Sequence, residues 1–201
     1  MMNSAAPSIF DATPQHPVQA IHAWLAQAKA AEVIEPTAVA FATANAQGIA
    51  SNRIVQILDV SAAGLVFATH VNSPKGADLQ ATGWASCVFH WPQVQRQVIV
   101  SGPVEALGAG QSDALWAARP PQSHAMSVVS TQSAPLADEQ ALREQALAAG
   151  ALGGLARPPK WAGFILRPHL VEFWQFAPDR LYKRLKYEWA QGQWTASRLQ
   201  P

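Results

Sequence analysis

Residues 73–75 combine the pattern of a helix start with a lysine side chain. Ser73 is a preferred N-cap residue, Pro74 a preferred first helical residue, and Lys75 comes next. The free N–H groups and positive dipole end of a helix attract phosphate groups. Arg53, in an upstream strand-like run, could add a second cation. The local sequence therefore indicates an anion site, and a plain helix cap with a solvated lysine is the alternative.

Gln97 is a polar residue in a strand-like run, 96–100. By strand periodicity, Val98 and Val100 share one face, while Gln97 and Ile99 share the other. An amide both donates and accepts hydrogen bonds, which suits the edge of a heterocycle. A surface glutamine with no ligand is the alternative.

Two further segments carry many hydrogen-bonding groups. Residues 118–133 are rich in proline and polar side chains, a composition typical of a binding loop, with a solvated loop as the alternative. Residues 171–187 contain Trp174, Arg180 and Arg184. The two arginines could clamp carboxylate or phosphate groups, although charges on an edge strand would look similar.

Composition limits the class of protein. The chain has 201 residues, 49% of them hydrophobic and 13% charged, and a formal net charge of +1. This favours one globular domain with part of its surface buried in an oligomer, and it argues against nucleic-acid binding. We expect no membrane span, because no apolar stretch approaches ~20 residues. We expect no secretory signal, because the N-terminus lacks a basic start followed by an apolar run.

Cysteine and histidine usage further limits the class of protein. The single cysteine, Cys87, lies in an apolar run and is expected to be buried and inert, which fits the cytoplasm. The spacing of the histidines matches no metal-binding motif, so no metal is expected.

The hydrophobic period changes along the chain. Residues 1–16 are expected to form a flexible arm, and a helix follows from Pro17 to about Ala31. β-Branched and aromatic runs predict strands at 37–45, 49–60, 65–70, 84–91, 96–107, 161–167, 170–175 and 183–199, the last with a turn at Gln191-Gly192. Short helices are expected at 74–81, 111–118 and 136–149.

Many short strands with few helices predict a mainly β (α+β) fold, a closed or partly closed β-barrel with peripheral helices. Gly102-Pro103 predicts a bend of the kind that closes a barrel. We expect residues 17–201 to form a single domain.

In their order and spacing, these segments resemble the pyridoxine (pyridoxamine) 5'-phosphate oxidase family from about residue 20 to Pro201. The resemblance implies an FMN-binding split β-barrel that dimerises and holds FMN at the subunit interface. It implies that Arg53 and Lys75 bind the FMN phosphate. The residues implied to bind FMN are Arg53, Ile54, Val55, Thr69, Ser73, Lys75, Gln97, Gln132, Ser133, Trp174 and Arg184.

We expect four of these FMN residues to reach the cofactor from the partner subunit of a homodimer. They are Gln132, Ser133, Trp174 and Arg184.

The substrate side of the family pattern is altered in this chain. The family's phosphate-binding lysine is here Leu58, its tyrosine is Leu115, and its histidine is Tyr182; the arginine of its SRKG-like turn is Pro74. An apolar side chain cannot bind a phosphate dianion, and an unpaired buried charge is costly. The residues implied to line the substrate side are Leu58, Leu115, Arg119, Ser123, His124, Arg180 and Tyr182.

The segments THVNSPKG, ARPPQSHAMSVVSTQS and RLQP resemble the phenazine-biosynthesis oxidases, a branch of the same family. That resemblance implies oxidation of reduced tricyclic phenazine carboxylates. A hydride equivalent would pass from the dihydro ring to flavin N5, with O2 as acceptor and H2O2 as product. Leu58 and Leu115 suit a flat substrate, and Arg119 or Arg180 suits its carboxylate.

No essential catalytic acid or base is assigned, although His124 and Tyr182 are candidates. Two alternatives stay open. One is a pyridoxine/pyridoxamine 5'-phosphate oxidase, and the other is a non-catalytic flavin-binding protein.

Overall fold

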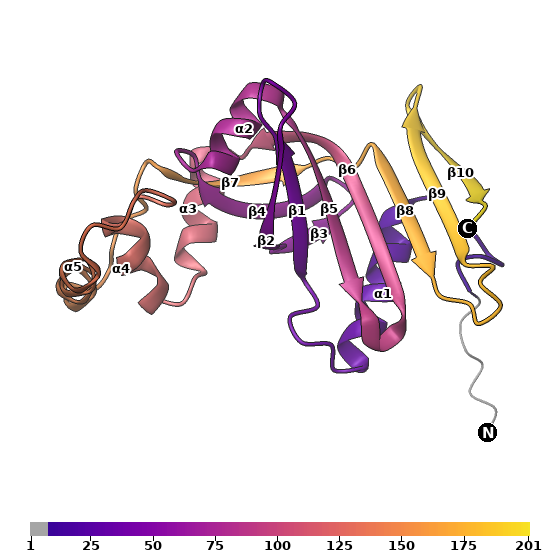
Figure 1. The fold of residues 1–201 in the computed structure, drawn as a ribbon, viewed down its shortest axis with the longest axis horizontal. Coiled ribbons are helices and arrows are strands. Elements are labelled where there is room, and N and C mark those ends of the chain that lie inside the picture. Colours follow the sequence, from indigo (N-terminus) through magenta and orange to yellow (C-terminus); the bar gives the residue numbers. More distant parts are fainter. Residues whose placement is uncertain (1–7) are drawn as a thin grey trace.

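The computed structural model describes residues 8–201 and shows a curled β-sheet with helices on its outside (Figure 1). Residues 1–7 of the expected flexible arm lie outside the described residues. The expectation is wrong for residues 8–16. Ile9 and Phe10 are buried, with the Phe10 ring 6.0 Å from that of Trp24, and the Tyr187 hydroxyl donates to the Pro14 carbonyl at 2.9 Å. Two apolar side chains therefore anchor this segment.

The first helix, α1 (Pro17–Ala30), confirms the expected helix. His16 caps it, because its side chain accepts a hydrogen bond from the Val18 N–H at 3.2 Å. The buried face carries Ala20, Ile21, Trp24, Leu25 and Ala28, the spacing of one helical face.

The strands pair antiparallel throughout and confirm the expected mainly β fold. One part of the sheet has the order β10-β9-β8-β6-β5-β1-β2, and β3, β4 and β7 join it through β6. The strands are β1 (Ala38–Ala44), β2 (Ala50–Gln56), β3 (Asp59–Ser61), β4 (Gly64–His70), β5 (Trp84–Trp91), β6 (Arg96–Ala106), β7 (Trp161–Leu166), β8 (Leu170–Gln175), β9 (Lys183–Ala190) and β10 (Gln193–Leu199).

The long strand β6 connects the two parts of the sheet. Its first part pairs with β5 and β8, and its end, from Val104, pairs with β7. A Cβ at Gly102 would lie 1.9 Å from the Arg167 carbonyl oxygen, so the crossing needs a residue without a side chain. The expected bend at Gly102-Pro103 is confirmed.

The single strand expected over 49–60 is wrong, because the chain changes partners within it. Strand β2 pairs with β1, whereas β3 pairs with β4. At the change, the Ile57 N–H donates to Thr37 and the Leu58 N–H donates to Val66, at 2.9 and 2.8 Å. Leu58 therefore lies where the two parts of the sheet meet.

The remaining helices lie outside the sheet. Helix α4 corrects the expected loop over 118–133: it follows Pro120-Pro121 and buries only Ala125, so it has no apolar stripe that the sequence could reveal. A short 3-10 turn spans Pro92–Val94. The helices are α2 (Pro74–Thr82), α3 (Ala109–Ala117), α4 (Gln122–Val129) and α5 (Glu139–Ala151).

The core lies inside the curled sheet and between the sheet and helix α1. Large buried side chains from several strands pack there, among them Phe41, Phe67, Phe89 and Trp91. Cys87 is fully buried, as expected, and burial raises the pKa of its thiol to about 12. Among the described residues, no helix is both long and apolar enough to cross a membrane.

Candidate functional site

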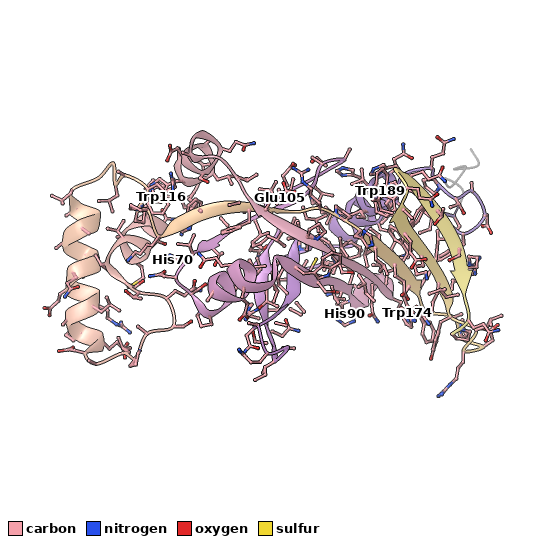
Figure 2. The ribbon with its side chains drawn as sticks, turned by 90° about the horizontal axis from the view of Figure 1, so that it is seen from above. His70, His90, Glu105, Trp116, Trp174 and Trp189 are labelled. Atoms are coloured by element: carbon pink, nitrogen blue, oxygen red, sulfur yellow. The ribbon has the colours of Figure 1, made fainter. Side chains whose placement is uncertain are left out.

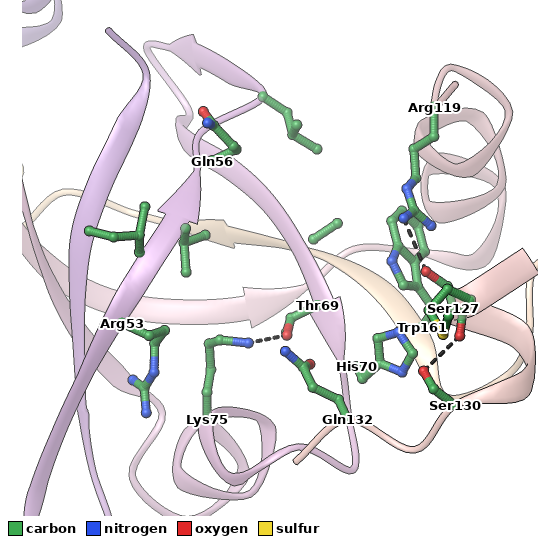
Figure 3. A pocket seen from close by; sticks show the side chains of 15 residues that line it. Arg53, Gln56, Thr69, His70, Lys75, Arg119, Ser127, Ser130, Gln132 and Trp161 are labelled. Carbon is green, nitrogen blue, oxygen red and sulfur yellow. Dashed lines mark hydrogen bonds between the residues drawn. The ribbon is translucent and has the colours of Figure 1, made fainter. Parts of the chain in front are cut away.

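An open cavity of about 620 Å³ lies between β2, β4, the start of α2 and helix α4 (Figure 3). Its lining contains four cationic or titratable side chains and no carboxylate. The lining residues are Arg53, Ile54, Val55, Gln56, Leu58, Ala68, Thr69, His70, Lys75, Arg119, Met126, Ser127, Ser130, Gln132 and Trp161.

The start of α2 forms one end of this cavity, the cationic end, defined by Arg53, Ser73 and Lys75. Ser73 is the N-cap, and its hydroxyl accepts from the Gly76 N–H at 3.2 Å and donates to the His70 carbonyl at 2.7 Å. Lys75 is 6% exposed and donates to the Thr69 hydroxyl. The cap expected from the sequence is present, and the lysine is buried rather than solvated.

Arg53 is held in place by the neighbouring strands. Its guanidinium donates to the hydroxyls of Thr43 and Ser51, at 2.7 and 2.6 Å. The same two hydroxyls donate to the Asp78 carboxylate, at 2.6 and 3.1 Å. Arg53 is thus oriented by a fixed network and retains capacity to bind an anion, because a guanidinium has five N–H donors.

Lys75 has no ion-pair partner among residues 8–201. Burial, and then the positive charge of Arg53, lower the pKa of Lys75 to about 8. Two neighbouring cations at a helix N-terminus are suited to a phosphate dianion, which would relieve their repulsion. The residues at this end therefore fit the phosphate group of a nucleotide cofactor.

Gln132 and Ser133 lie beside the cationic end. They line a smaller hollow of about 160 Å³ together with Arg53, Ser73 and Lys75 of their own chain. The expectation that these two residues reach the site from a partner subunit is therefore wrong: the segment after α4 returns to the start of α2 within one chain.

The opposite end of the cavity has one cation on an aromatic surface. The Arg119 guanidinium lies over the rings of Trp116 and Trp161, 4.9 and 5.2 Å from their centroids. It donates to the Ser127 hydroxyl at 3.0 Å. Leu58, 50% exposed, also lines the cavity. This end suits a flat, partly apolar ligand that carries an anionic group.

Three further residues expected to bind FMN lie elsewhere, in one row across the sheet. Gln97, Trp174 and Arg184 are direct neighbours in the register of β6, β8 and β9. The Tyr182 ring lies 5.0 Å from Trp174. The row lies at the other end of the molecule from His70 (Figure 2), so one chain does not bring it to the cavity.

Other residues of the expected substrate side lie outside the cavity lining. Leu115 packs against Gly163, and Ser123 donates to the Pro120 carbonyl at 2.7 Å. The His124 ring stacks on Trp116 with centroids 4.3 Å apart, and its Nε2 is 2.9 Å from the Trp116 carbonyl oxygen. Arg180 follows β8, close in sequence to Tyr182.

Several cavity residues were not expected from the sequence. His70 ends β4 next to Thr69, and a polar residue ending an apolar strand was the only available signal. The others are Gln56, Ala68, Met126, Ser127, Ser130 and Trp161.

The curled sheet has the fold of a class of FMN-binding proteins, and comparison with protein families agrees. Residues 25–150 match the family model for pyridoxamine 5'-phosphate oxidase. Residues 161–201 match the C-terminal dimerisation region of pyridoxine 5'-phosphate oxidase. The chain belongs to the pyridoxamine 5'-phosphate oxidase family, whose members are FMN-dependent oxidoreductases.

Within this family, the chain is similar to dihydrophenazinedicarboxylate synthase of Burkholderia lata, with 41% identity over 193 residues, 96% of this chain and 91% of the relative. It is 39% identical to pyridoxine/pyridoxamine 5'-phosphate oxidase of Neisseria meningitidis, over 92% of this chain and 90% of the relative. Its structure is similar to that of PhzG from Burkholderia lata 383 in complex with tetrahydrophenazine-1-carboxylic acid. The TM-score is 0.95 at 39% identity, and 98% of each chain is covered.

Proposed function

We propose that this protein is an FMN-dependent oxidase of late phenazine biosynthesis that oxidises reduced phenazine carboxylates. The observation that carries the proposal is the division of the cavity. One end has two cations at a helix start, the other has Arg119 on an aromatic surface, and Leu58 also lines the cavity.

The cationic end would hold the FMN phosphate. Arg53, Lys75 and the start of α2 provide charge and donors there, and Thr69, Gln132 and Ser133 lie within reach. When bound, FMN supplies the redox chemistry, accepting a hydride equivalent and passing two electrons to O2 to form H2O2. The protein binds and orients cofactor and substrate.

The Arg119 end would hold the substrate. A guanidinium can bind a carboxylate through two parallel hydrogen bonds, and Trp161 and Leu58, which both line the cavity, could contact a tricyclic ring. Support also comes from PhzG of Burkholderia lata, whose structure contains tetrahydrophenazine-1-carboxylic acid.

A homodimer would complete the site. Gln97, Trp174 and Arg184 form one row on the sheet, far from the cavity of their own chain, so they could reach FMN only in a partner subunit. Arg180 and Tyr182 belong to the same end of the molecule. The match of residues 161–201 to a dimerisation region supports this arrangement. We expect the enzyme to act in the cytoplasm, where its single thiol would stay reduced.

The second candidate function is pyridoxine 5'-phosphate oxidation, because a vitamin oxidase is 39% identical to this chain and a phenazine enzyme is 41% identical. Overall identity does not separate the two. Leu58 does, since it lines the cavity where the family pattern has a phosphate-binding lysine.

Oxygen consumption tests the proposal and also the non-catalytic alternative. The FMN-loaded protein should consume O2 and release H2O2 when a reduced phenazine carboxylate is added in air, above the rate of the same mixture with free FMN. Binding of FMN without turnover would leave a flavin-binding protein as the better interpretation.

A further inference from the structure

His70 is a buried cavity residue with no role in the function proposed above. It is 8% exposed, its side chain makes no hydrogen bond within residues 8–201, and Nδ1 is fully enclosed. One nitrogen of Arg119, Nη1, is likewise enclosed without a partner. Buried polar atoms are nearly always paired in proteins, so two such atoms in a single cavity mark a place suited to a polar ligand group.

The position of His70 is fixed by the same turn that starts α2. His70 ends β4 opposite Trp161 of β7. Its carbonyl oxygen accepts hydrogen bonds from the N–H and the hydroxyl of Ser73, at 3.2 and 2.7 Å. Figure 3 shows the imidazole between Lys75 and Ser130, on the way from the cationic end to Arg119. A substrate held by Arg119 beside the flavin would meet this ring.

The charges that face His70 are all positive. They belong to Lys75 of α2, Lys160 just before β7, and Arg119 just after α3, and the cavity lining contains no carboxylate. Burial, and then Lys160, Arg119 and Lys75, lower the pKa of His70 below its usual 6.5. A carboxylate between these groups would be stabilised by all of them and would restore a partner to the imidazole.

We propose that His70 is a specificity-determining residue, which donates a hydrogen bond to the substrate carboxylate beside Arg119 and so selects carboxylated tricycles. This inference rests on the proposed function. It goes further by assigning the carboxylate two protein partners, one on β4 and one after α3, rather than Arg119 alone. No bond is made or broken in this role, which concerns binding only.

Binding of two ligands that differ only in the carboxylate tests the proposal without turnover. The probes are phenazine-1-carboxylate and unsubstituted phenazine, titrated into the FMN-loaded protein and followed by the flavin absorbance. His70→Phe keeps the ring volume and removes the donor. It should lower affinity for phenazine-1-carboxylate roughly 10- to 100-fold and leave phenazine affinity unchanged. His70→Asn, which retains a donor, should recover part of the loss.

His22→Phe is the matched control, because His22 is exposed on α1, away from the cavity. FMN content is measured first, so that only folded, loaded variants are compared. The quantity compared is the affinity for phenazine-1-carboxylate divided by the affinity for phenazine. If this ratio differs by less than about threefold between His70→Phe and the wild type, the inference is overturned. If the wild-type protein binds neither ligand, the proposed function itself fails, which is a different result.

The pH dependence of the unmodified protein gives a test that needs no variant. A carboxylate partner raises the pKa of His70, so ligand binding takes up a proton. Affinity for phenazine-1-carboxylate should therefore be highest below the pKa of free His70 and fall as pH rises above it. Affinity for phenazine should not change in that way. Parallel curves for both ligands would contradict the proposal.

Discussion

At the scale of single residues, we propose that binding of the FMN phosphate depends on two cations, Arg53 and Lys75. The Arg53→Ala, Lys75→Ala double variant should bind FMN about 10²- to 10⁴-fold more weakly, because each charge-assisted hydrogen bond contributes about 1.5–3 kcal/mol. Equilibrium dialysis or quenching of FMN fluorescence measures the affinity. The control is Lys29→Ala, at an exposed lysine near the end of α1. Equal FMN affinity in the double variant and the control would refute the phosphate assignment.

If Lys75 binds the FMN phosphate, FMN affinity should also depend on pH. Its pKa is about 8 in the free protein, and a bound phosphate dianion favours the protonated form, which raises the pKa. The contribution of Lys75 is therefore fully present below pH 8, and affinity falls as pH rises above 8, by up to about tenfold per pH unit.

Lys75→Arg is the comparison, because a guanidinium stays charged throughout this range. FMN titrations from pH 6 to pH 10, about the range set by the pKa of Lys75, should fall at the alkaline end for the wild type only. The same alkaline loss in both proteins would assign it to another group.

At the scale of the elements, β6 depends on Gly102 to pass from one part of the sheet to the other. Gly102→Ala should destabilise the protein by about 2–4 kcal/mol, since the new Cβ would lie 1.9 Å from the Arg167 carbonyl oxygen. Gly110→Ala is the control, because nothing lies within 4 Å of that Cβ and the residue is within helix α3. Thermal or urea unfolding measures both variants. Equal stability of the two would show that β6 tolerates a side chain at the bend.

The same elements show how far the sequence could predict the structure. Strand periodicity and the Gly102-Pro103 pair predict the barrel, and Ser73-Pro74 predicts α2. Helix α4 was not predictable, because it buries only Ala125 and contacts mainly another exposed helix. The change of partner strand at Leu58 was not predictable either. It depends on which strands lie on either side of this residue, and not on the local sequence.

Only part of the candidate site was predictable, because some of its residues come together through contacts between distant elements. The resemblance named Arg53 and Lys75, and the structure brings them together. His70 was not predicted as a site residue. Its environment is set by burial and by three cations from other elements, and neither can be read from the sequence around it. Gln132 was expected from the partner subunit, and only the path of the chain after α4 shows that it is local.

At the scale of the whole molecule, a composite site predicts complementation between subunits. The Arg53→Ala, Lys75→Ala chain damages the cavity, and a Trp174→Ala, Arg184→Ala chain damages the row of Gln97, Trp174 and Arg184. In a mixed dimer of the two, one site is intact and the other carries both defects. Random mixing should therefore restore about a quarter of the flavin sites. FMN content and sedimentation measure this, and a fully flavinated wild-type monomer would contradict it, as would mixing without any recovery.

We propose that the cavity selects a phenazine carboxylate over a phosphorylated vitamin. It rests on Leu58, which offers apolar surface where a phosphate would need a cation; losing one such contact should cost roughly 3 kcal/mol, about 10²-fold in the specificity constant. A Leu58→Lys variant should accordingly shift preference toward pyridoxine 5'-phosphate.

Anaerobic stopped-flow reduction of the bound flavin, with both substrates on a single enzyme preparation, is the most direct test. We expect rapid bleaching by a dihydrophenazine carboxylate, little by pyridoxine 5'-phosphate, and a smaller difference in Leu58→Lys. If pyridoxine 5'-phosphate bleaches the wild-type flavin as fast as the phenazine precursor, the phenazine assignment is wrong and the vitamin oxidase is the better account.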